Sequence, residues 1–147
     1  QSTEMGAETY FTNSLKDEAL KSKVVSLRNE DSGVEGILQG KLLTVDIIAD
    51  ESVIEAKNTK YLPTENVLAT LYRVTVKVEL ILKKPNSSEI FWRGEFQQTS
   101  NYSAPQITLP VINTANALYN NSAKRQTLDA LSKDMMQAAF DRMLERF

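Results

Sequence analysis

The chain of 147 residues contains no cysteine and no histidine. Without cysteine it has no residues for a disulfide, a thiolate metal site or a cysteine nucleophile. Without histidine it lacks the usual general base, the common pH switch and the most frequent metal ligand. Its five glycines are scattered, so it has neither a phosphate-binding loop nor a dinucleotide-binding fingerprint. We therefore expect a non-enzymatic protein with no cofactor and no metal.

Strong charge and long apolar runs are also missing. The formal net charge is −2, which gives no basic surface for nucleic acid. No apolar run approaches the roughly 18 residues that a membrane-spanning helix needs, and no stretch of these residues has the pattern of a signal peptide. The hydrophobic fraction of 41% and the charged fraction of 24% are ordinary for a globular protein. The length predicts a single domain over residues 1–147.

Both ends of the sequence have the apolar spacing of amphipathic helices. The first predicted helix covers residues 3–23, and the second covers residues 123–147. The apolar face of the first comprises Tyr10, Phe11, Leu15, Ala19 and Leu20. That of the second comprises Leu128, Leu131, Met135, Ala139, Met143 and Phe147, widened by Met136 and Phe140.

The strands are predicted between these helices. Residues 24–31 form a short strand, and residues 33–56 form a β-rich run in which Gly36 and Gly40 indicate a bulge or a close backbone approach. Residues 71–82 alternate most strictly. Tyr72, Val74, Val76, Val78, Leu80 and Leu82 face one side, whereas Arg73, Thr75, Lys77 and Glu79 face the other.

A hairpin loop leads into a returning strand at residues 90–98, and residues 99–122 are predicted to be a long polar loop. The resulting order favours an α+β two-layer sandwich. In this fold a mostly antiparallel meander sheet is covered on one face by the N-terminal helix and the long C-terminal helix.

Trp92 is the only tryptophan of the chain. Its position in the predicted sheet bears on whether the protein binds nucleic acid, because exposed aromatic side chains can stack on bases. Neighbouring strand residues point to opposite faces, so Trp92 shares the apolar face with Ile90, Gly94 and Phe96. Phe91 is then the one aromatic on the polar face of this strand. A single exposed aromatic is not a base-stacking platform. We therefore assign Trp92 to the core and expect no nucleic-acid partner.

The sequence resembles the LptE family of outer-membrane lipopolysaccharide-assembly lipoproteins (RlpB-like) in five stretches that span nearly the whole chain. The first is TEMGAETYFTNSLKDE, in which Thr3, Glu4, Gly6, Glu8, Phe11, Thr12, Leu15 and Glu18 fill the family pattern. The others are GVEGILQGKL, LYRVTVKVELIL, EIFWRGEF and LDALSKDMMQAAFDRMLERF. They occur in the family's order and spacing, although each alone is mostly an amphipathic pattern.

This resemblance implies a protein on the periplasmic side of the outer membrane, held there by an N-terminal lipid anchor. It implies two partners, an LptD-type β-barrel whose lumen the protein plugs and lipopolysaccharide itself. Family members begin with a lipid-modified cysteine and a first strand. Neither is among these residues, so we interpret the sequence as a fragment of such a protein.

Two groups of residues are candidates for these contacts. Lys124 and Arg125 occupy the region before the closing helix where the family has a basic site for lipopolysaccharide phosphates, with Lys57 and Lys60 as weaker candidates. Cations near a helix N-terminus oppose the helix dipole, which favours a functional or crystal-packing reason over stability. Arg73, Thr75, Lys77 and Glu79 would face the polar barrel lumen. Ordinary solvated surface would show the same residue types.

Three alternatives remain open from the sequence. The first is another Gram-negative envelope lipoprotein or adaptor of similar shape. The second is a periplasmic ligand-binding domain, which needs a pocket with convergent polar groups. The third is an enzyme that uses carboxylates alone, which needs two acids facing each other across a cleft, about 5–10 Å apart.

Overall fold

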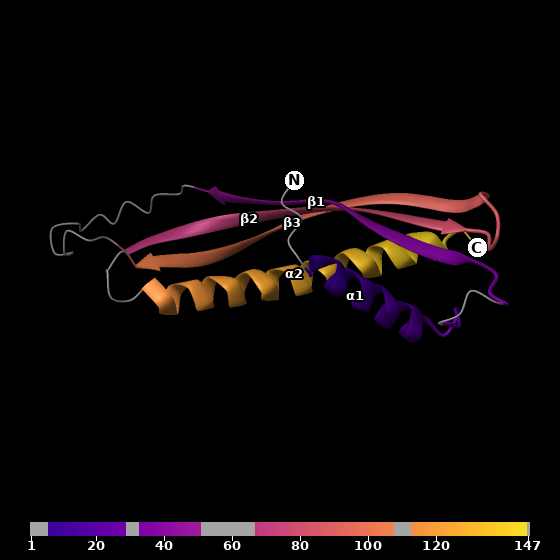
Figure 1. Ribbon diagram of the computed structural model, residues 1–147, viewed down its shortest axis with the longest axis horizontal. Helices are drawn as coiled ribbons and strands as arrows, with labels where there is room; N and C mark the ends of the chain where they lie inside the picture. Colours follow the sequence, from indigo (N-terminus) through magenta and orange to yellow (C-terminus); the bar gives the residue numbers. More distant parts are fainter. Residues whose placement is uncertain (1–5, 29–32, 51–66, 108–112, 147) are drawn as a thin grey trace.

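The computed structural model describes residues 6–28, 33–50, 67–107 and 113–146. The elements are helix α1 (Ala7–Ser22), strands β1 (Ile37–Asp50), β2 (Val67–Lys83) and β3 (Ile90–Ile107), and helix α2 (Asn113–Leu144). The strands form an antiparallel sheet in the order β1-β2-β3. Both helices lie on the same face of this elongated sheet (Figure 1). The predicted α+β sandwich is therefore confirmed.

The core lies between α2, α1 and the inner face of the sheet. From β2 it contains Val74, Val76, Val78 and Leu80, and from α2 it contains Leu128, Leu131, Met135, Met136 and Ala139. These residues belong to the apolar faces predicted for the strand and the closing helix. On α1 the prediction holds for Phe11 and Ala19, but Leu20 is 65% exposed.

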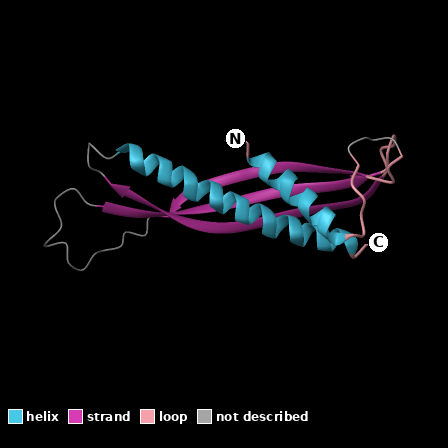
Figure 2. Ribbon diagram, turned by 90° about the horizontal axis from the view of Figure 1, so that it is seen from below, coloured by secondary structure: helices cyan, strands magenta, loops and turns pink. Residues whose placement is uncertain are grey.

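The two helices meet through a buried pair of hydroxyl groups. Ser14 and Ser132 are 5% and 0% exposed, and their Oγ atoms are 2.8 Å apart. The Ser132 hydroxyl also donates to the carbonyl of Asp129 at 2.8 Å, so the Ser14 hydroxyl is the donor to Ser132. Small side chains at this point allow α1 to pack closely against the C-terminal half of α2 (Figure 2).

We expect Ser132→Ala to lower the free energy of unfolding by about 1–2 kcal/mol, because the buried Ser14 hydroxyl loses its acceptor. Urea denaturation of Ser132→Ala, Ser14→Ala and the double variant checks this. The double variant should lose less than the sum of the two single losses, since no unpaired hydroxyl is left. Additive losses would contradict a direct bond.

Trp92 lies on the core side of β3, as predicted. It is half-buried and packs against the two buried clusters of the core, with its ring 6.1 Å from that of Phe96. Ile90, however, is 52% exposed. The reason is a bulge: Leu82 pairs with Trp92 but Lys83 pairs with Ile90, so that Phe91 is an extra residue and the alternation shifts.

Two further predictions from sequence were wrong. Residues 24–28, expected in a short strand, are irregular, and residues 99–122 do not form a long loop throughout. Strand β3 continues to Ile107 and α2 begins at Asn113. Polar residues dominate this stretch, and most of them have a low strand propensity. The residues of β3 pair with β2 nevertheless, because the neighbouring strand overrides this intrinsic propensity. Lys57 and Lys60, the weaker candidates for the lipopolysaccharide contact, lie outside the described residues.

Candidate functional site

The outer face of the sheet points away from both helices (Figure 1). Arg73, Thr75, Lys77 and Glu79 lie on this face, because the intervening residues Val74, Val76 and Val78 are buried in the core. The opposing residues of β3 are polar too: Thr75 pairs with Thr99, Lys77 with Gln97 and Glu79 with Glu95. Over this stretch β2 and β3 therefore present a polar surface that no helix covers within the described part of the chain.

The side chains of this polar face bind one another across β2 and β3. Arg93 donates to Glu79 from Nε at 2.6 Å and also from its Nη2 atom. Lys77 Nζ lies 2.9 Å from Glu95 Oε2, and the hydroxyls of Thr75 and Thr99 are 3.0 Å apart. Glu79 and Glu95 face each other directly, which is unfavourable for like charges. A diagonal cation on each of them offsets this repulsion.

Glu79 departs from the other three residues of the predicted barrel-facing set. It is only 8% exposed, although its position in β2 is on the outer face, because Arg93 lies against its carboxylate. Arg73 is exposed, and Thr75 and Lys77 are half-buried. The surface available at the Glu79 position is thus largely that of Arg93, whose side chain is 58% exposed. No pattern in the sequence indicates this diagonal pairing.

The hydrogen bond and charge of Lys77 lower the pKa of Glu95. A carboxyl whose folded-state pKa is lowered stabilises the fold above its unfolded-state pKa of about 4.3, and this contribution is lost as the pH falls through the folded-state value. We expect Lys77→Gln to return the Glu95 pKa toward 4.3 and to make stability less sensitive to acid. An NMR titration of the Glu95 carboxyl carbon checks this. An unchanged titration in Lys77→Gln would contradict it.

Lys124 and Arg125, the predicted lipopolysaccharide contacts, lie inside α2. The helix begins at Asn113, about three turns earlier, so the expected position near a helix N-terminus was wrong and the dipole argument does not apply. Arg125 is exposed and Lys124 is half-buried. Both are in the helical layer, on the opposite side of the sheet from the polar outer face. The two groups of candidate residues therefore do not form one site.

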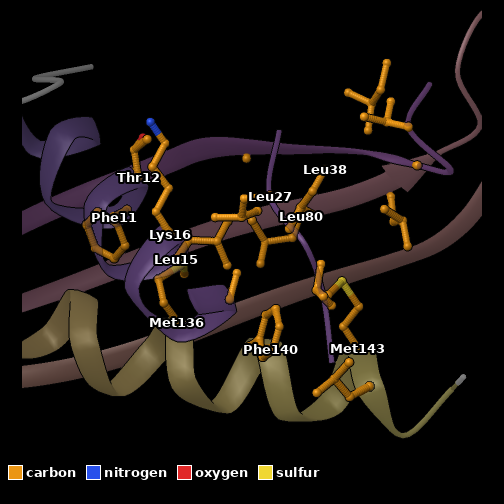
Figure 3. A pocket seen from close by; sticks show the side chains of 18 of the residues that line it. Phe11, Thr12, Leu15, Lys16, Leu27, Leu38, Leu80, Met136, Phe140 and Met143 are labelled. Atoms are coloured by element: carbon orange, nitrogen blue, oxygen red, sulfur yellow. The ribbon is translucent and has the colours of Figure 1, made fainter. Parts of the chain in front are cut away.

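A hollow of about 1030 Å³ lies between α1, the beginning of β1 and the last turns of α2. Its inner part is lined by apolar side chains of the two helices and the sheet (Figure 3). Leu15, Leu38, Leu80, Met136, Phe140 and Met143 are among them. Sequence reasoning missed this feature, because residues that line a hollow follow the same apolar periodicity as residues that fill a core. We call it the apolar pocket.

The described residues contain no cluster of three or more acidic side chains that could hold a metal ion. Within the same ranges, no helix combines the length and the apolar character needed to cross a membrane.

Comparison with known proteins identifies the family. The family model for LptE, described as lipopolysaccharide assembly, matches residues 1–147. This chain belongs to the LptE family. The resemblance inferred from its sequence motifs is thereby confirmed, and membership makes the protein part of lipopolysaccharide assembly in the cell envelope. No curated protein matches the LptE-family chain in sequence.

Two crystal structures resemble the LptE-family chain in fold. One is described as a lipoprotein from Caulobacter crescentus CB15, with 10% identity and a TM-score of 0.51, and the match covers 95% of this chain and 81% of that one. The other is a minor lipoprotein from Acinetobacter baumannii, with 15% identity and a TM-score of 0.47, covering 92% and 82%. At such identity the first supports the fold alone, and the second is too distant to add to the argument.

Proposed function

We propose that this LptE-family protein is a non-enzymatic plug and support inside an LptD-type β-barrel of the outer membrane, and that it contacts lipopolysaccharide there. The observation that carries the proposal is the polar outer face of the sheet. The interior of a large outer-membrane barrel is polar. A closed barrel also has no free strand edge, so a plug must meet its wall through side chains, as the outer face would do.

Pairing within the outer face favours such a contact. Charged groups that enter an interface unpaired carry a desolvation cost, whereas pre-formed pairs lose less on contact. Arg93–Glu79 and Lys77–Glu95 are ion pairs within the free protein. Their remaining donor and acceptor positions are available to polar side chains and water on a lumen wall.

The lipopolysaccharide contact is assigned to Lys124 and Arg125. Lipid A and the core sugars carry phosphates, which bind cationic side chains through charge-assisted hydrogen bonds. Since these two residues belong to the helical layer, a protein that meets the barrel through its sheet keeps them on the other side. Lipopolysaccharide and the barrel would then occupy separate surfaces. In this proposal residues 1–147 act as one domain on the periplasmic side of the outer membrane, held by a lipid anchor that precedes them.

The test is co-expression of the full-length protein with an LptD-type barrel, followed by affinity purification in detergent. We expect a stoichiometric complex. Lys77→Glu should weaken it about tenfold, because three carboxylates would then adjoin on the outer face. Lys133→Glu is the matched control, since Lys133 is also a lysine in an ion pair, with Asp129, but lies on α2 and not on the outer face. A folded protein that forms no complex would instead indicate another envelope adaptor.

Lipopolysaccharide binding is tested separately. We expect the double variant Lys124→Glu/Arg125→Glu to bind lipopolysaccharide about tenfold more weakly and to retain the barrel complex. Binding to immobilised lipopolysaccharide at two salt concentrations measures this, with Lys133→Glu again as the control. An equal loss of binding in Lys133→Glu would mean that the effect comes from the net charge of the protein. The lipopolysaccharide contact could then not be assigned to Lys124 and Arg125.

A further inference from the structure

The apolar pocket exists because α1 packs on α2 and not on the near edge of the sheet. The Ser14–Ser132 bond fixes α1 to α2, and the inner-face residues Leu38 and Leu42 of β1 remain only half-buried. Protein interiors are normally packed to near crystal density. A space of about 1030 Å³ is instead comparable to the sites of bound small molecules, about 300–1,000 Å³.

The chemistry of the lining points to an apolar chain. Phe11, Leu15 and Leu80 surround the inner part together with Met136 and Met143 (Figure 3). Methionine side chains are flexible and polarisable, and they adapt to chains of varied shape. No convergent set of polar side chains lines this inner part, so the hollow does not suit a sugar or a nucleotide.

The opening of the pocket is apolar but bordered by charge. Val24 and Leu27, which line it, are 74% and 45% exposed, and Phe91 is 43% exposed. Exposed apolar residues that continue into a hollow mark a binding surface more often than ordinary surface. The amine of Lys16 extends from α1 away from Met136 and Phe140, beside Thr12 (Figure 3).

Three cations and two carboxylates border the same hollow: Lys16, Arg28 and Lys41, and Glu8 and Glu35. In the described ranges none of these three cations makes an ion pair with a carboxylate, in contrast to Lys21, Lys77, Lys84, Arg93 and Lys133. A bound anion would supply the missing partner. The border thus suits a ligand with a negatively charged headgroup.

We infer that the apolar pocket holds one acyl chain of an anionic lipid, whose headgroup lies at Lys16 and Arg28. An acyl chain accounts for the apolar lining and for the apolar residues at the opening. An anionic headgroup accounts for the unpaired cations at its border. This inference concerns a surface remote from Lys124 and Arg125, and it does not depend on the barrel contact proposed above.

Isothermal titration calorimetry with dodecanoate, below its micelle concentration, tests this inference. We expect saturable binding of one molecule per chain. Leu38→Trp, which fills the pocket from β1, should weaken binding at least about tenfold. Ile48→Trp is the matched control, because Ile48 is on the same strand, 63% exposed and outside the pocket lining, and it should bind as the wild type does.

The headgroup is tested by a second variant that leaves the interior intact. We expect Lys16→Glu/Arg28→Glu to lose dodecanoate binding about tenfold and to bind dodecyl maltoside, a neutral amphiphile with the same chain, unchanged. Lys84→Glu serves as the surface control. Absence of dodecanoate binding, or equal binding by Leu38→Trp with a native circular dichroism spectrum, would overturn the inference. So would a protein that covers this face by forming a dimer and takes up no dodecanoate.

Discussion

Gly94→Val is expected to lower the free energy of unfolding by about 3 kcal/mol, as in overpacked cores. Gly94 pairs with Leu80 on the core side of β3. A Cβ atom there would lie 2.7 Å from the Trp92 ring and 2.8 Å from the Phe96 ring, closer than carbon atoms can approach. Strand propensity alone would favour valine over glycine by up to about 1 kcal/mol, so the steric term must decide the sign.

Chemical denaturation measures the loss, and the fluorescence of Trp92, the only tryptophan, reports whether its ring has moved. Gly40→Val is the matched control in β1. A Cβ at Gly40 would meet only the end of the Leu80 side chain, at 3.2 Å, so its loss should stay below about 1 kcal/mol. Equal stability of the two variants would refute the close approach of both rings to Gly94.

Leu131→Ala should cost about 2–5 kcal/mol, the range for removing a buried leucine and leaving a cavity. Leu131 is 2% exposed and belongs to the cluster that joins α2 to the sheet. Among the described elements, only α2 runs along most of β3. Loss of this contact therefore weakens the packing of α2 on the sheet. Thermal and urea unfolding measure the change.

Leu20→Ala is the control for the same chemical change. Leu20 lies on α1 and is 65% exposed, so its truncation should change stability by less than about 0.5 kcal/mol. The sequence pattern alone placed both leucines on buried helical faces, whereas in the structure only Leu131 is buried. The two variants therefore distinguish the structure from the sequence pattern. A large loss in Leu20→Ala would mean that α1 packs differently.

The layers of this fold could be predicted from the sequence because its helices and central strand follow strict periods. Val74 to Leu80 alternate with polar residues, and the apolar residues of α2 recur at helical spacing. Both patterns require a single covered face. Element ends were less predictable: β3 continues through a polar segment to Ile107, because pairing with β2 depends on a neighbour that is distant in the sequence.

The candidate sites were less accessible to sequence reasoning. Alternation correctly placed Arg73, Thr75 and Lys77 on the outer face, but the burial of Glu79 depends on Arg93, which lies on another strand. The exposure of Ile90 depends on one extra residue, Phe91, in a bulge. The apolar pocket depends on where α1 crosses α2, and the periodicity of either helix does not encode that crossing.

The most direct test of the proposed barrel contact is photo-crosslinking in the co-expressed complex. A photoreactive amino acid replaces Gln97, which is exposed and pairs with Lys77 on the outer face. The same replacement at the buried residue Val76 is the control. The proposal predicts a crosslink to the barrel from position 97 and none from position 76. A complex that co-purifies intact but gives no barrel crosslink from position 97 would contradict it.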